Sequence, residues 1–465
     1  MTSTADAGLT ATGHKAAGPF ALGSWMLFDW ATQPFYTLVT TFLFAPYFSD
    51  VFIGDAAHGA ALWGYTMAAS AIMVAIGSPI LGAIADAQGK LKRMIAWQSV
   101  GFVIGQLLLW YAFPGASQYL WIVLAGLLLA TVTGEFATVL NNSLMPRLAR
   151  ADQLGRLSGG GWALGYVGGL ISLILMAGFV LVDAQSGKTM LGLDPVVALD
   201  VGTREADRIV PPLAALWYVV FVIPFFIFTP DAPAIPGAAR VTIRQALAGL
   251  AATLSNIGRY RNLVIFFVSR MLFIDGLLAI FTFGGIYAVS IFGWQTLTVG
   301  YFGIILSVAA GIGAAVGGVL DDRLGSKPVI IGSLLILIAG SLGVMSIDAT
   351  HIFFTVEVPP RPEGAAVFAG TGERVYMAFA VLIGLASGPL QSACRSLLAR
   401  LAPPEHMSEF FGFFAFSGKV TAFAAPFIIG VVSSTTGSLQ TAMFVILAFL
   451  LAGMVGMVFV KTERA

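Results

Sequence analysis

Six charged side chains lie inside apolar stretches that are each long enough to cross a membrane: Asp29, Glu135, Arg270, Asp275, Arg395 and Lys419. A charge in the hydrocarbon region costs roughly 3 kcal/mol even on lenient scales, so such residues usually serve an ion or substrate pathway. A carboxylate can bind a proton or an ammonium group, and an arginine or lysine can bind a carboxylate. We therefore expect these residues, and Asn142 at the repeat position of Arg395, to bind a small solute or a coupling ion.

The distribution of these charges predicts how they pair. The acids Asp29 and Glu135 lie in the first half of the chain, whereas the bases lie in the second half. At a helix rise of 1.5 Å per residue, these acids and the two arginines lie roughly 8 to 15 Å from the cytoplasmic surface. We expect ion pairs between the halves when that side closes, with Asp29 or Glu135 as the carboxylate that takes up a proton. Alternatively, Lys419 and Asp275 form a pair that only stabilises the second half.

The composition around these charges is that of a membrane protein. Of 465 residues, 58% are apolar and only 10% are charged, which leaves too little polar surface for a soluble globule of this size. Segments of about 20 apolar residues, the length that crosses a bilayer, follow one another along the chain. We expect an all-α polytopic membrane protein with twelve transmembrane helices at 20–48, 60–86, 93–113, 118–145, 157–182, 209–229, 262–292, 296–320, 328–347, 372–400, 408–434 and 438–460.

The loops between these segments predict the orientation. Most of the 24 lysine and arginine residues fall on one side of the twelve-helix arrangement. An excess of these residues marks the cytoplasmic side, so both termini are expected there, most simply in a bacterial inner membrane. The polar first 19 residues are expected to be a cytosolic tail and not a signal peptide.

One loop motif occurs twice and relates the two halves of the chain. GAIADAQGKLKR begins at Gly82, and GVLDDRLGSK begins at Gly318. The glycines let helices approach closely, and Asp86 can cap a helix start. The basic residues that follow, Lys90 to Arg93, are expected to hold the loop at the headgroups. We expect both loops to gate the cytoplasmic side through Gly82, Asp86, Gly89, Lys92, Gly318, Asp322, Gly325 and Lys327.

A second echo supports a six-plus-six arrangement. The run that begins at Arg147 is repeated from Arg400 onward, with Gly159 matched by Gly412 and Asp152 by Glu405. The prolines that follow position 229 break the helical pattern, and an amphipathic helix is expected at 241–259. The expected organisation is a tail at 1–19, a six-helix bundle at 20–229, a linker at 230–261, a second bundle at 262–460 and a tail at 461–465. The outer loop at 183–208 is expected to be solvated.

Other chemistry is not indicated. Net charge is +1, the four histidines are scattered, and there is no glycine-rich phosphate loop, so we expect no nucleic acid, nucleotide, metal or cofactor. No nucleophile and base can be assembled, so an enzyme is not expected. The lone Cys394 excludes an intramolecular disulfide. Five aromatic residues are candidates to line a cavity, although packing or interface anchoring would also explain them: Trp30, Tyr36, Trp162, Tyr166 and Tyr287.

The two loop motifs resemble those of the major facilitator superfamily, and this resemblance covers nearly the whole chain. Five segments are similar to its vacuole-effluxer-like branch, also called the Unknown Major Facilitator family: SWMLFDWATQPF, GSPILGAIADAQGKLKR, LSGGGWALGYVGG, SRMLFIDGLLAIFTFGGIYA and FFGFFAFSGKVTAFAAPF. Asp29, Arg270, Asp275, Gly276, Ser417, Gly418 and Lys419 fall on these segments. The branch usually has Asn-Ser where this chain has Thr32-Gln33, which leaves the substrate open.

The resemblance implies alternating access, in which two six-helix bundles rock about a site near the middle of the membrane. Mixed acids and bases suit a zwitterion such as an amino acid. We therefore expect a monomeric, ion-driven secondary transporter for a small polar solute, coupled to protons. The alternatives are an organic-anion or peptide transporter of the same fold, and a membrane receptor or sensor that binds its ligand without moving it.

Overall fold

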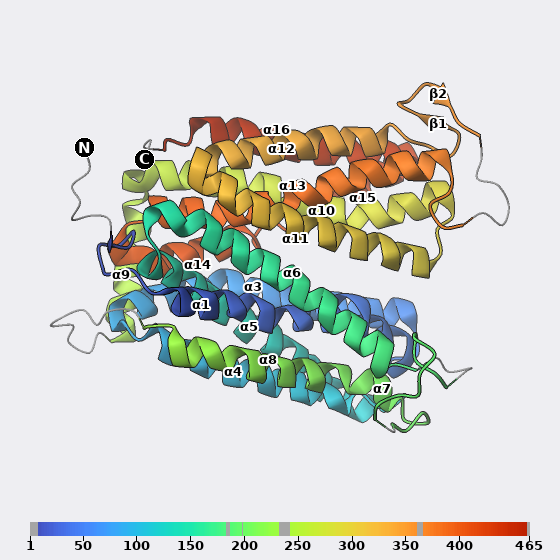
Figure 1. The fold of residues 1–465 in the computed structure, drawn as a ribbon, viewed down its shortest axis with the longest axis horizontal. Helices are drawn as coiled ribbons and strands as arrows, with labels where there is room; N and C mark the ends of the chain where they lie inside the picture. Colours follow the sequence, from blue (N-terminus) through green and yellow to red (C-terminus); the bar gives the residue numbers. More distant parts are fainter. Residues whose placement is uncertain (1–7, 183–186, 198, 232–241, 360–365, 463–465) are drawn as a thin grey trace. The chain divides into compact units, whose positions relative to one another are not determined.

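The computed structural model describes residues 8–182, 187–197, 199–231, 242–359 and 366–462, and it is built almost entirely of helices (Figure 1). Ten helical segments in this part of the chain are long and apolar enough to cross a membrane. Their helices are α3 (Ala56–Gln88), α4 (Leu91–Leu108), α5 (Leu120–Leu148), α6 (Leu154–Phe179), α8 (Val210–Phe228), α10 (Arg261–Phe292), α11 (Thr296–Leu324), α12 (Ser326–Met345), α13 (Thr371–Leu401) and α16 (Leu439–Phe459). The predicted all-α polytopic membrane fold is confirmed.

The first expected span is not one continuous helix. α1 covers Pro19–Pro34, a π-helical stretch follows at Phe35–Phe42, and α2 (Phe44–Tyr47) leads to another π-helical turn at Phe48–Phe52. Pro34 lacks an amide hydrogen, which favours the wider helix that begins directly after it. The hydroxyls of Thr40 and Thr41 donate to the carbonyl oxygen of Tyr36 inside that stretch. The helix is therefore wider directly after Pro34.

The eleventh expected span is also interrupted. α14 ends at Ser417 and α15 (Ala424–Thr436) begins after a series of turns at 418–423. Of the twelve expected spans, the first and the eleventh are thus divided into shorter helices, and the count of twelve is not fully confirmed. Both interruptions come from local chemistry that apolar length does not report, namely a proline in the first case and a glycine followed by a proline in the second.

The chain forms two compact units. The first contains Met1–Arg150, Leu164–Leu250 and Pro404–Gly412, and the second contains Ala151–Ala163, Ala251–Pro403 and Phe413–Ala465. In the first unit, α4 packs on α5 and α8, and α1 packs on α8. In the second unit, α13 packs on α11 and α12, and α10 packs on α16. The start of α6 thus clusters with second-half helices, and the start of α14 (Met407–Ser417) clusters with first-half helices.

Several connecting segments contain regular structure of their own. α9 (Ile243–Ser255) is the described helix of the expected linker, whose residues 232–241 lie outside the described part of the chain. β1 (His351–Ile352) and β2 (Val356–Glu357) form a small antiparallel hairpin. In the loop expected to be solvated, α7 (Glu205–Arg208) ends on a fully buried arginine. Arg208 lies 3.4 Å from the ring centroid of Phe113 and donates to the carbonyl of Trp110, so this end of the loop is anchored.

Candidate functional site

Asp86, in the last turn of α3, holds the first turn of α14. Its carboxylate accepts hydrogen bonds from the amides of Ser408 at 3.0 Å and Glu409 at 2.8 Å, and from Arg147 at 2.9 Å. A carboxylate at a helix N-terminus satisfies free amides and complements the helix dipole. Asp86 therefore caps a helix start, as its sequence position suggested. We call Asp86, Arg147, Ser408 and Glu409 the first latch.

Glycines bring the backbones of α3 and α14 into contact at the first latch. A Cβ atom on Gly82 would lie 2.1 Å from the carbonyl oxygen of Ser408. One on Gly412 would lie 2.4 Å from the carbonyl oxygen of Ser78. Because both obstacles are backbone atoms, they cannot move aside as a flexible side chain would. Both glycines were part of the sequence repeats, and this close approach gives the physical reason for glycine at each position.

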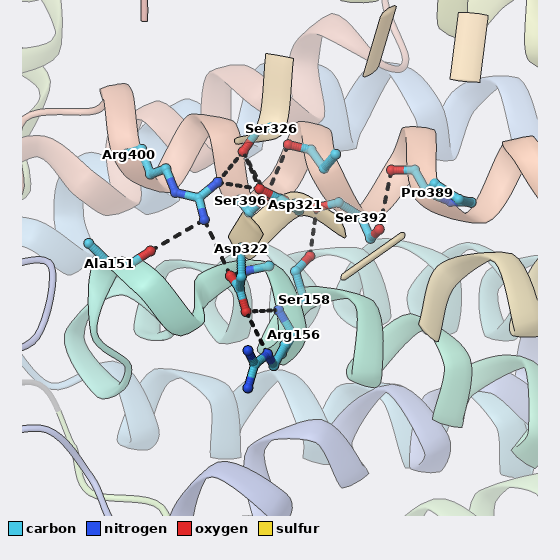
Figure 2. Close-up of polar contacts among 12 residues, drawn as sticks. Ala151, Arg156, Ser158, Asp321, Asp322, Ser326, Pro389, Ser392, Ser396 and Arg400 are labelled. Carbon is cyan, nitrogen blue, oxygen red and sulfur yellow. Dashed lines mark hydrogen bonds and ion pairs between the residues drawn. The ribbon is translucent and has the colours of Figure 1, made fainter. Parts of the chain in front are cut away.

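Figure 2 shows the corresponding arrangement at the end of α11. Asp322, the repeat partner of Asp86, accepts hydrogen bonds from the amides of Gly155 at 2.7 Å and Arg156 at 3.0 Å, at the start of α6. The neighbouring Asp321 accepts hydrogen bonds from Arg400, Ser326 and Ser396. We call Asp321, Asp322, Ser326, Ser396 and Arg400 the second latch. In the second latch the backbone amides bind Asp322 and the arginine binds Asp321, whereas Asp86 alone makes both kinds of contact in the first latch.

The second latch has the same glycine contact. A Cβ atom on Gly159 would lie 2.4 Å from the carbonyl oxygen of Ala314, and one on Gly318 would lie 2.6 Å from that of Gly155. Gly159 and Gly412, which are matched in the sequence repeat, thus each allow two helix backbones to come into contact. The internal repeat in the sequence corresponds to a repeated contact: the end of one helix capped onto the start of another.

The remaining loop residues shape the chain and tie a third helix to each latch. Gly89 and Gly325 have φ angles of +64° and +89°, which L side chains rarely adopt. Lys92 donates to the carbonyls of Phe226 at 2.8 Å and Thr229 at 2.6 Å, at the end of α8. Lys327 does the same at the end of α16, to the carbonyls of Val458 and Val460. Free carbonyls at a helix C-terminus attract an ammonium group, so Lys92 ties the end of α8 to this loop, while the expected position of the loop at the headgroups stays a prediction.

Replacing Lys92 with alanine is expected to lower stability by about 1 kcal/mol, because the last carbonyls of α8 lose a charged donor. Thermal unfolding of the purified protein in detergent measures the change. Lys90→Ala is the matched control, since Lys90 lies two residues earlier in the same loop and is exposed. Equal melting temperatures for the two variants would show that the cap contributes nothing to stability.

Of the charges within the expected spans, Arg395 is bound to the start of α6. Its Nε donates to the hydroxyl of Ser158 at 2.9 Å and its Nη2 to the carbonyl of Ser158 at 2.6 Å. Ser158 in turn donates to the carbonyl of Ser392 at 2.7 Å. Arg395 is 3% exposed, and its guanidinium lies 5.9 Å from the ring centroid of Trp162. This arginine therefore connects the interior of the second unit to its latch.

Arg270 caps a different helix end. It donates to the carbonyl of Phe414 and the hydroxyl of Ser417, both at 2.8 Å, and lies 3.5 Å from the ring centroid of Phe414. These contacts lie at the C-terminal end of α14, where free carbonyls favour a cation. The ion pair expected of Arg270 when the cytoplasmic side closes stays a prediction; in this structure the guanidinium hydrogen-bonds to the end of α14. Asp275, on the same helix, is 1% exposed.

The first unit gathers its own polar group. Asp29 on α1 and Glu135 on α5 are both close enough to Tyr36, in the π-helical stretch, to act on it electrostatically. A Cβ atom on Gly165 of α6 would lie 3.6 Å from the Cβ of Asp29 and 3.5 Å from an amide oxygen of Gln33. The glycine face of α6 therefore lies against this side of α1 and leaves the two acids partly exposed.

The other candidates have varied positions. Trp30 stacks on Trp217 with ring centroids 5.5 Å apart. Tyr287 is 2% exposed and donates to the carbonyl of Ile347 at 2.6 Å, so it is a packing residue. Asn142 is buried in α5, Tyr166 lies on α6, and Lys419 belongs to the turns between α14 and α15.

Sequence reasoning missed several residues of the site. Ser158, Ser326, Ser396 and Ser408 gave no signal, because a serine in an apolar helix is usually neutral. Asp321 had one: the second motif reads Asp-Asp where the first has Ala85-Asp86. The partners of the motif aspartates are backbone amides, which no residue type reveals.

Comparison with known proteins agrees with this geometry. An uncharacterised MFS-type transporter of Bacillus subtilis, YxiO, is 25% identical over 95% of both chains. Autophagy-related protein 22 of Cryptococcus neoformans is 28% identical over 63% of this chain, and the match covers 48% of that protein. The chain thus spans about half the length of this fungal relative.

Solved structures share the fold. The major facilitator superfamily transporter FucP aligns over 96% of this chain and 99% of its own, with a TM-score of 0.70 and 16% identity. The human organic anion transporter MFSD10 (TETRAN) aligns over 95% and 100%, with a TM-score of 0.70 and 13% identity. Fold and family point to a transporter and not to an enzyme. The model of the family described as "Vacuole effluxer Atg22 like" matches residues 51–465, and the chain belongs to this family.

Proposed function

We propose that the protein is a secondary active transporter that moves a small polar or zwitterionic solute, preferably amino-acid-like, by alternating access coupled to protons. The observation that carries the proposal is the pair of latches. Each holds a helix start by a few hydrogen bonds to one or two aspartates at a glycine contact. Such a contact can open and close without disturbing the apolar core of either unit, which alternating access requires.

The charges support the substrate class. Asp29 and Glu135 of the first unit are suited to an ammonium group, and Tyr36 beside them offers an aromatic face. Arg395 of the second unit is suited to a carboxylate. Together they match an amino acid better than a neutral sugar. Membership of the vacuole-effluxer-like family supports release of a solute from a compartment.

An organic anion is the second candidate. MFSD10, which has the same fold, is an organic anion transporter. Arg395 alone could bind the negative charge of such a substrate, and the acids would not be needed. A receptor that binds without transport is the third candidate. We further propose a monomer in a bacterial inner membrane with both termini and both latches on the cytoplasmic side, since lysine and arginine gather in the latch loops.

Uptake into proteoliposomes tests the proposal. A panel of amino acids, peptides and organic acids is supplied to vesicles containing the purified protein, with and without an inward proton gradient. Accumulation of amino acids that requires the gradient is the expected result. Accumulation of organic acids alone would favour the second candidate. A ligand that raises the melting temperature but shows no flux under any gradient would contradict transport and favour the receptor.

A further inference from the structure

The interruption between α14 and α15, in the second unit, is caused by particular residues of the sequence. Residues 418–423 form turns inside a stretch that is apolar enough to be expected as one span. Gly418 begins the turns, and Pro426 lies in the first turn of α15, so both helices have a chemical reason to end here. Helix breaks at membrane depth are tolerated where their backbone groups find partners, and in transporters they often form ion or substrate sites.

Arg270 of α10 occupies one side of this break. Its guanidinium holds the last carbonyl groups of α14 through Phe414 and Ser417. A Cβ atom on Gly418 would lie 3.1 Å from Nη1 of Arg270, so a larger residue would press on the guanidinium. The Nε of Arg270 is buried and has no hydrogen-bond partner among the residues that the structure describes. The N–H group at Nε of Arg270 is therefore still available to donate a hydrogen bond.

Asp275 occupies the other side of the break. It lies five residues after Arg270 on α10, about 7.5 Å further along the helix axis at 1.5 Å per residue. Within the described part of the chain, neither of its carboxyl oxygens has a hydrogen-bond partner, although the residue is 1% exposed. The hydroxyl of Thr421, from the turns, is the polar side chain beside this carboxyl group, although the contact falls outside ordinary hydrogen-bond geometry.

The surroundings of Asp275 contain little charge. Among the helices that contact α10, α15 and α16 have no ionisable side chain, α11 carries Tyr301, Asp321, Asp322 and Arg323, and α13 carries Glu373, Arg374, Tyr376, Cys394, Arg395 and Arg400. Cys394 of α13 faces Arg270, and Arg270 is the charged group that acts on Asp275 among the described residues. Lys419 belongs to the turns themselves. An ionised carboxylate without hydrogen bonds in such a place is strongly disfavoured relative to a neutral acid.

We propose that Asp275 carries the proton of this transporter, and that its proton decides whether Arg270 caps α14 or pairs with Asp275. This inference rests on the proton-coupled transport proposed above. The described structure corresponds to the protonated form, in which a neutral acid leaves Arg270 on Phe414 and Ser417. When the proton leaves, the carboxylate attracts the guanidinium through its unused Nε. Arg270 then releases the end of α14, and the turns at 418–423 rearrange.

Infrared difference spectroscopy of the full-length protein, between acid and alkaline pH, tests whether Asp275 takes up a proton. The wild type is expected to show a protonated-carboxyl C=O band that is lost in Asp275→Asn and kept in Asp275→Glu. Asp194→Asn is the control, because the Asp194 carboxylate is 82% exposed and paired with Lys188, and it is expected to leave the band unchanged. A band that survives Asp275→Asn, or that disappears in Glu135→Gln instead, would overturn the assignment.

A transport measurement separates this inference from the function on which it rests. Asp275→Asn is expected to lose the part of substrate accumulation that an inward proton gradient drives. If the variant keeps the full gradient effect, Asp275 is not the carrier although proton-coupled transport stands. If the wild type itself ignores the gradient, proton coupling is wrong and the carrier role is wrong with it.

Discussion

Replacing Asp29 with asparagine, or Arg395 with alanine, is expected to reduce flux about 100-fold, while the protein remains folded and inserted. Each change removes a charge assigned to one end of a zwitterionic substrate. A hydrogen bond to a charged group in a buried site is worth roughly 1.5–3 kcal/mol, and about 1.4 kcal/mol corresponds to a tenfold change. Initial uptake rates in proteoliposomes with matched protein content measure the effect.

The controls for these variants lie on the same segments. Asp50→Asn removes an exposed carboxylate that follows α1 and α2, and Arg374→Ala removes an exposed arginine in the first turn of α13. Both are expected to transport at rates near those of the wild type. Arg395→Lys separates charge from geometry, because lysine keeps the charge but cannot hold both oxygens of Ser158 as the guanidinium does. Wild-type flux in Asp29→Asn and Arg395→Ala would remove both residues from the proposed substrate site.

Valine at position 82 is expected to reduce transport at least about tenfold, since overpacking costs roughly 1–3 kcal/mol or more where the obstacle cannot yield. Already the Cβ atom would lie 2.1 Å from the carbonyl oxygen of Ser408, so α3 and α14 must separate. The amides of Ser408 and Glu409 would then move away from Asp86, and the first latch would open. Uptake rate and melting temperature measured on the same preparation show whether the loss is of transport or of folding.

Gly64→Val is the matched control for Gly82→Val. Gly64 lies on the same helix, and a Cβ atom there meets nothing within 4 Å. The second latch offers the same comparison on α11, with Gly318→Val against Gly300→Val, since Gly300 also faces open space. Equal transport by Gly82→Val and Gly64→Val would show that the close helix contact is not needed for the cycle.

Much of the fold could be predicted from the sequence because apolar length controls it. The expected span at 262–292 corresponds to α10 at Arg261–Phe292, and the expected span at 438–460 to α16 at Leu439–Phe459. The repeated motif also indicated where equivalent contacts would form, since Asp86 and Asp322 both cap a helix start.

What could not be predicted depends on partners that have no side-chain signature. Asp86 accepts hydrogen bonds from the amides of Ser408 and Glu409, some 320 positions later in the chain. No residue in that segment indicates that a distant carboxylate caps its helix. The bonds from Lys92 to the carbonyls at the end of α8 were not predictable either, because those acceptors are backbone atoms. Average hydropathy also concealed the break after Ser417, because the apolar runs on both sides outweigh the few polar residues of the turns at 418–423.

The measurement that tests the central claim most directly is substrate-driven proton movement. Proteoliposomes containing the full-length protein and a pH-sensitive dye are given an amino acid on one side with no gradient imposed. The account predicts a change of internal pH that follows the substrate gradient, reverses when the substrate gradient is reversed, and is absent in empty vesicles. A substrate that crosses the membrane without any pH change would contradict proton coupling, and an amino acid panel in which nothing crosses would contradict the proposed function.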